Sequence, residues 1–80
     1  MTEAQLKSFS AFQSLPIYDE SDADSANVTS ADGRYCCIRE CVTLAAVREC
    51  LADRRLVPLG AIRAEVDGGS IVVAYFGELM

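Results

Sequence analysis

The clearest pattern of hydrophobic and polar positions lies in the last third of the chain. In residues 62–66 apolar side chains alternate with charged ones, which is typical of a strand with one solvated face. Residues 67–70 read Asp-Gly-Gly-Ser and predict a turn. Residues 71–76 are apolar throughout, which favours a strand covered on both faces. The pattern therefore predicts a two-stranded hairpin.

The middle of the chain has helical periodicity instead. Apolar side chains recur at helical spacing between residues 44 and 51, with charged residues on the remaining surface. Thr43 is a good N-cap, and Pro58 and Gly60 are typical of a helix end. We therefore expect a helix over residues 44–56.

A further strand is predicted upstream of this helix. Residues 34–40 contain a Tyr-Cys-Cys-Ile run that is apolar on both faces of a strand. An Asp32-Gly33 pair precedes them, and such a pair between extended segments indicates a hairpin turn, because glycine accepts a positive φ. The expected hairpin partner is the segment 28–30.

The N-terminal segment fits two structures. Thr2 and Gln5 have the spacing of a capping box, which predicts a helix over residues 3–14 that ends before Pro16. However, the apolar side chains between positions 9 and 17 also alternate, so a strand remains open.

These elements predict one α+β domain over residues 1–80, in the order α-β-β-α-β-β. We expect a small antiparallel sheet of about four strands with helix packed on one face. Residues 19–27 are acidic and rich in turn formers, and are expected to form a solvated loop. A domain of 80 residues has a small core, so self-association as a homodimer is a natural way to bury more surface.

The net charge of the chain is concentrated in its first part. Residues 1–33 carry six acidic residues and one lysine, a net charge of −5, whereas residues 34–80 carry six of each sign. This asymmetry favours charge-guided binding to a basic partner and disfavours direct binding of DNA or RNA, which calls for a basic face. The chain has no histidine, the usual base near neutral pH, so a non-enzymatic protein without a cofactor is expected.

The four cysteines match no standard metal-binding spacing. Cys36, Cys37, Cys41 and Cys50 contain no Cys-x-x-Cys pair, and we predict reduced, buried thiols and no metal site. An intermolecular disulfide formed in air stays an alternative. On an extended strand Cys36 and Cys37 point to opposite faces, which would expose one of them. The acidic residues after position 18 fail the ligand spacing of a calcium-binding EF-hand in both registers tried.

The expected location is the cytoplasm. The N-terminus has neither a basic nor an apolar signal region, and the longest apolar run, residues 71–76, is far shorter than the roughly 20 residues that span a membrane.

Two groups of residues are candidates for partner binding. Strand 71–76 would seek another strand if it lay at a sheet edge, and its Tyr75 is the aromatic candidate for such a contact. Acidic side chains would engage lysines or arginines of a partner, although they also suit a segment that only keeps the domain soluble. These acidic candidates are Asp19, Glu20, Asp22, Asp24 and Asp32.

The profile as a whole resembles the small acidic anti-CRISPR proteins of phages and mobile elements. The resemblance covers the whole chain through its size, acidity, α+β pattern and lack of catalytic residues, without a shared motif. It implies a stoichiometric inhibitor in a host bacterial cell that binds Cas effector subunits and blocks target DNA recognition or nuclease recruitment. A small homo-oligomeric structural or accessory module of a larger assembly is the alternative.

Overall fold

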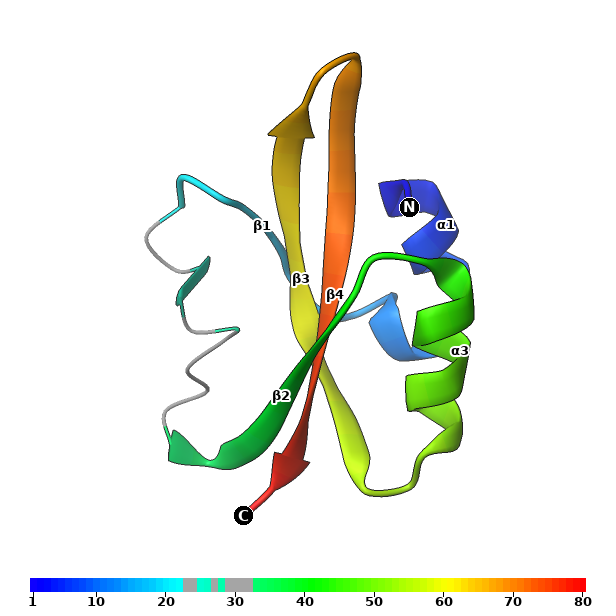
Figure 1. Cartoon of the computed structure of the whole chain (residues 1–80), viewed down its shortest axis with the longest axis vertical. Coiled ribbons are helices and arrows are strands. Elements are labelled where there is room, and N and C mark those ends of the chain that lie inside the picture. Colours follow the sequence, from blue (N-terminus) through cyan, green and yellow to red (C-terminus); the bar gives the residue numbers. More distant parts are fainter. Residues whose placement is uncertain (23–24, 27, 29–32) are drawn as a thin grey trace.

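The computed structural model describes residues 1–22, 25–26, 28 and 33–80. Two strands form a long central hairpin, and the helices lie together on one side of it (Figure 1). The elements in chain order are α1 (Glu3–Lys7), the 3-10 helix η1 (Ser10–Phe12), β1 (Ile17–Asp19), β2 (Tyr35–Cys41), α3 (Leu44–Ala52), β3 (Leu56–Val66) and β4 (Gly69–Leu79).

The four strands form one mixed sheet in the order β1-β3-β4-β2. β4 pairs antiparallel with β3 and β2, whereas β1 runs parallel to β3. The α+β class is confirmed, but the expectation of a purely antiparallel sheet is wrong. A parallel pair needs a long connection, and β2 and α3 supply it, because both lie between β1 and β3 in the chain.

The predicted order of elements is matched only in part. Among the described residues, the strand before β2 is β1 rather than a segment at 28–30. Val28 is buried, and residues 29–32, with most of the predicted hairpin turn, lie outside the described residues. β2 pairs instead with the C-terminal half of β4.

The central hairpin agrees with its prediction and extends beyond it. β3 and β4 pair from Val66↔Gly69 at the turn to Leu56↔Glu78 at the far end. Because β4 lies between β3 and β2, it is not an edge strand, and the proposal that strand 71–76 pairs with a partner's strand loses its premise.

The N-terminal helix forms with its predicted cap but is short. Thr2 Oγ1 accepts a hydrogen bond from the Gln5 amide, and Gln5 Oε1 accepts one from the Thr2 amide. The helix ends at Lys7, not at residue 14, and Ser8 donates its hydroxyl hydrogen to the Gln5 carbonyl. Serine side chains compete with helical backbone bonds in this way, which favours an end here.

The main helix, α3, begins as predicted and also ends early. Thr43 Oγ1 accepts from the Ala46 amide. The helix stops at Ala52, because Asp53 has an extended backbone and its carboxylate accepts hydrogen bonds from the Arg55 amide and guanidinium. The segment after Asp53, which was predicted to be helical, turns into β3.

β3 passes through Pro58 and Gly60, which were expected to end a helix. β1 pairs with β3 only from Ala61 onward, so Pro58 lies where a missing amide hydrogen costs no bond to β1. Gly60 lies at a register shift and has a φ of 145°, which only glycine adopts readily.

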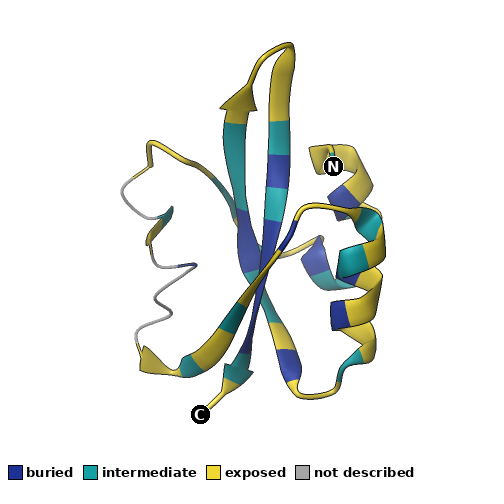
Figure 2. Ribbon diagram, viewed as in Figure 1, coloured by how far each residue is buried: buried dark blue, intermediate teal, exposed yellow. Residues whose placement is uncertain are grey.

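The apolar core lies between the sheet and the helices (Figure 2). The ring of Phe12 meets that of Phe76 edge to face, with centroids 5.5 Å apart. The most deeply buried core side chains are Leu6, Phe12, Cys41, Val47, Ala61, Ala74 and Phe76. Both strand partners of β4 are therefore anchored on one shared core.

The cysteines divide into two pairs. Cys41 and Cys50 are buried, with their Sγ atoms 3.3 Å apart, as expected for small apolar side chains. Cys36 and Cys37 are both exposed, which the sequence did not predict. Their expected placement on opposite faces is wrong, because Cys37 has a φ of 56° at a bulge in β2 and the two Sγ atoms lie within 4.8 Å.

Candidate protein-binding surface

The edge strand β1 is held to the sheet by a charged cluster. Asp19 at its end lies opposite Arg63 of β3 in the parallel register. Arg63 donates from Nη1 to Asp19 Oδ1 at 2.7 Å, and its Nη2 pairs with Oε1 of Glu3 from α1. Asp19 and Glu3 raise the pKa of the Arg63 guanidinium. One arginine thus joins β1, β3 and the N-terminal helix.

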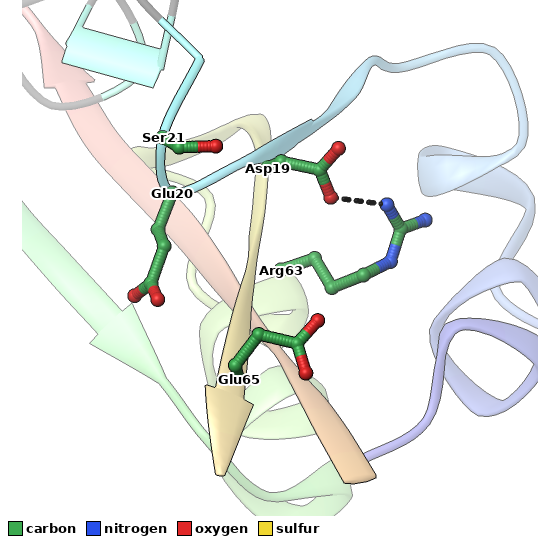
Figure 3. Close-up of a pocket in the computed structure, with 5 residues that line it drawn as sticks. All are labelled: Asp19, Glu20, Ser21, Arg63 and Glu65. Carbon is green, nitrogen blue, oxygen red and sulfur yellow. Dashed lines mark hydrogen bonds and ion pairs between the residues drawn. The ribbon is translucent and has the colours of Figure 1, made fainter.

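A surface hollow of about 380 Å³ lies beside this cluster, where β1 ends and β3 continues (Figure 3). Figure 3 shows the Asp19 carboxylate turned toward the Arg63 guanidinium and the Glu20 carboxylate lying apart from it. Glu65 follows Arg63 by two positions on β3, so it lies on the same face of that strand. The lining residues are Asp19, Glu20, Ser21, Arg63 and Glu65.

The charge of this surface is negative. Glu3, Asp19, Glu20 and Glu65 contribute four carboxylates around the single guanidinium of Arg63. Within the described ranges, Arg63 is paired with the first two, and Glu20 and Glu65 have no ion pair. Both of these glutamates are exposed. The carboxylates of Glu20 and Glu65 are therefore available to a positively charged group of another molecule.

The backbone holds these groups in place. The Glu20 amide donates to the Arg63 carbonyl at 3.0 Å and extends the β1–β3 ladder by one bond. The Asp22 amide then donates to the Asp19 carbonyl at 2.9 Å, which closes a turn. The start of the acidic segment is thus fixed against the sheet, whereas a solvated loop was expected over residues 19–27.

The structure brings together only some of the predicted binding residues. Asp19 and Glu20 lie at the hollow, and Asp22 is exposed in the turn after them. Asp24 and Asp32 lie outside the described residues. Tyr75 lies on the central strand with 9% of its surface exposed, which leaves little side chain for a partner to contact. Burial and then the charge of Glu40 raise its pKa.

Sequence reasoning missed the other members of the surface. Glu65 and Arg63 were recognised as the solvated positions of a strand, and this alternation was the available signal. Their meeting with Asp19 and Glu3 depends on the β1–β3 register and on the packing of α1, and the sequence pattern specifies neither.

In the part of the chain that the structure describes, no helix has the length and apolar character needed to cross a membrane. Comparison of the chain with protein-family models, curated proteins and solved structures finds no match.

Proposed function

We propose that this chain is a non-enzymatic binding protein whose acidic surface at the β1 edge contacts a basic surface on a protein partner. Its most specific form is an anti-CRISPR inhibitor that binds a CRISPR–Cas effector complex and blocks target DNA recognition or nuclease recruitment. The observation that carries the proposal is the hollow beside the Asp19–Arg63 pair, where Glu20 and Glu65 form no ion pair with any residue that the structure describes.

Electrostatics explains why such a surface suits this partner. Effector complexes hold nucleic acid in positively charged channels. Carboxylates at such a channel take the place of phosphates, and complementary charge accelerates association and fixes orientation. The same carboxylates repel nucleic acid, so we expect the protein to bind the effector and not its DNA.

The rigidity of the surface also supports the proposal. Arg63 fixes the Asp19 carboxylate, and the ladder bond of Glu20 fixes the backbone next to it. Groups that are already ordered lose less conformational entropy on binding than a free acidic tail would. A binding role therefore fits this end of the segment better than a purely solubilising role.

The first experiment is affinity capture from bacterial lysates that contain CRISPR effector complexes, with washes at low and high salt and mass spectrometry of the eluate. We expect Cas subunits to be recovered at low salt and released as salt rises, because screening weakens contacts between exposed charges. Recovery of no Cas subunit would contradict the anti-CRISPR form of the proposal.

A pair of matched variants then tests the surface itself. Glu20→Gln with Glu65→Gln removes two negative charges at the hollow and leaves the Arg63 ion pairs intact. Glu40→Gln with Glu49→Gln removes the same charge from exposed positions on β2 and α3. We expect the first pair to weaken partner binding roughly tenfold at low salt and the second to have little effect. Equal losses would show that only net charge matters.

A homo-oligomeric module is the second candidate, and an apolar patch favours it. Val57 and Leu79 are 37% and 68% exposed. Val57 lies opposite Gly77 of β4, and Leu79 follows Gly77 by two positions, so Val57 and Leu79 share one face of the sheet. The buried side chain of Phe76 points to the other face, which carries the core. A mass that rises with protein concentration in light scattering, and that Leu79→Ser abolishes, would favour this function over the first.

A further inference from the structure

The bulge in β2 gives two neighbouring cysteines an unusual placement. Cys36 pairs with Glu78 of β4, and the next paired residue of β2 is Arg39, opposite Phe76. Two residues of β2 therefore lie opposite the single residue Gly77. The extra residue is accommodated by Cys37, whose φ of 56° is rare for a residue with a side chain.

The bulge brings three potential ligand atoms together. The Sγ atoms of Cys36 and Cys37 and a carboxylate oxygen of Glu78 all lie within 4.8 Å of one another. In a regular strand the two thiols would point to opposite faces. Bulges commonly re-aim a side chain in this way, and here the result is a dithiol beside a carboxylate.

An arginine lies near the carboxylate of this group. Arg55, which is paired with Asp53 after α3, lies with Nε 3.8 Å from Glu78 Oε1. The Glu78 carboxylate is therefore within reach of this guanidinium and of both thiols.

We propose that Cys36, Cys37 and Glu78 bind a thiophilic divalent cation, with Zn²⁺ as the expected ion and water as its fourth ligand. Zinc prefers four ligands in a tetrahedron and combines cysteine sulfur with carboxylate oxygen. Tetrahedral bond lengths of about 2.3 Å to sulfur place two sulfurs roughly 3.8 Å apart, so small side-chain adjustments complete the site. Binding exchanges the two thiol protons for the metal, with no change of oxidation state.

In the described part of the chain, the buried pair of Cys41 and Cys50 lacks two features of the Cys36, Cys37 and Glu78 group: a third ligand and access to water. The Sγ atoms of Cys41 and Cys50 lie 3.3 Å apart, but both residues are buried, and no third ligand completes a cluster with them among the described residues. The exposed pair offers a carboxylate and access to water. This site lies on the β2–β4 side of the sheet and does not depend on the proposed binding function at the β1 edge.

The experiment is a zinc titration of the reduced 80-residue chain, freed of metal, against a chromophoric chelator. Co²⁺ serves as a second probe, because thiolate ligation gives a sulfur-to-cobalt charge-transfer band in the near ultraviolet. We expect one ion per chain and a rise in melting temperature with zinc, since a ligand that binds only the native state stabilises it.

Variants assign the site to its residues. Cys36→Ser with Cys37→Ser should weaken zinc binding by more than about 100-fold and abolish the cobalt band, and Glu78→Gln should weaken binding by roughly 10- to 100-fold. Cys50→Ala is the control for the loss of one thiol and should bind as the wild type does, whereas Cys36→Ser, which also loses one, should not. Circular dichroism confirms that each variant is folded.

Two results would overturn the proposal. One is the absence of zinc binding at micromolar concentration by the reduced wild-type chain. The other is equal zinc affinity of the wild type and the folded variant that lacks both Cys36 and Cys37. In that second case, loss of zinc binding in Cys50→Ala would place the ion at the buried pair of Cys41 and Cys50.

Discussion

At one edge of the sheet, β1 is a three-residue strand held by the ion pairs of Arg63; at the other, β2 is a seven-residue strand interrupted by a bulge at Cys37. Exposed edge strands can pair with strands of other chains, and proteins prevent this pairing with short strands, charged side chains or bulges. β1 uses shortness and charge, and β2 uses a bulge. The two solutions leave different chemistry at the surface: carboxylates at one edge and thiols at the other.

Both edges depend on the same central hairpin. Among the described strands, β1 pairs with β3 alone and β2 with β4 alone, so the two edge strands are not neighbours in the sheet. A substitution that destabilises the hairpin should therefore destabilise both edge strands. A substitution at the contacts of one edge strand should destabilise that strand alone.

Removal of the Phe76 ring should affect both edges at once. This side chain is fully buried on β4 and packs on Phe12. Phe76→Ala should lower the free energy of unfolding by about 3–5 kcal/mol, which is a large part of the stability of a small domain. Urea unfolding followed by circular dichroism measures the loss, and a change below about 1 kcal/mol would contradict the core described here.

Two glycines allow each edge to be damaged separately. A Cβ at Gly60 would lie 3.2 Å from the Pro16 carbonyl oxygen, next to β1, and the φ of 145° adds strain. A Cβ at Gly77 would lie 2.9 Å from Ile38 Cδ1 and 3.0 Å from Tyr35 Cβ, both on β2. We expect Gly60→Ala to cost about 2–3 kcal/mol and Gly77→Ala about 1–2, because the methyl groups of Ile38 and Leu59 can rotate away and the 3.0 Å contact with Tyr35 Cβ is relieved by a small shift of β2.

Amide hydrogen exchange distinguishes the two glycine variants. Gly60→Ala should raise exchange in β1 and at the Glu20 amide more than in β2, and Gly77→Ala should do the reverse. Equal acceleration at both edges in either variant would show that the edges are coupled more tightly than the sheet order indicates.

The charged cluster at the β1 edge should make a smaller, salt-dependent contribution to the stability of the fold. Arg63→Met removes the partner of Asp19 and Glu3 while keeping an apolar stem. Because the cluster is exposed to solvent, we expect a fall of only a few degrees in melting temperature at low salt, and less in high salt. A fall that is independent of salt would point to packing of the arginine stem instead.

The smallest effect concerns the thiols of β2. A neutral maleimide should label two cysteines in the native chain and four in denaturant, because Cys41 and Cys50 are buried. Burial and the hydrogen bond with Cys50 also raise the pKa of the Cys41 thiol to about 12, which slows its reaction. Mass spectrometry counts the labels. Glu78→Gln should accelerate labelling of Cys37, since loss of the carboxylate removes the main cause of its raised pKa. Three or more native labels would contradict the burial of the inner pair.

Local signals in the sequence explain which elements were predicted. The capping pairs Thr2–Gln5 and Thr43–Ala46 involve neighbours in the chain, and both hydrogen-bond as expected. The hairpin turn after Val66 is similarly local, because Gly68 supplies a φ of 87°. The ends of the two helices were less predictable, because Ser8 and Asp53 redirect the chain through bonds that depend on exact side-chain geometry.

The sequence by itself determined the α+β class, the helix starts, the central hairpin and the concentration of negative charge in the first part, because each rests on periodicity, turn residues or composition. Only the tertiary structure decided that β1 lies parallel to β3, that β4 is central and that Cys36, Cys37 and Glu78 meet. The physical reason is that these features depend on the register between distant segments. Hydrophobic alternation tells which face of a strand is buried, but not which strand lies beside it or where an extra residue will bulge.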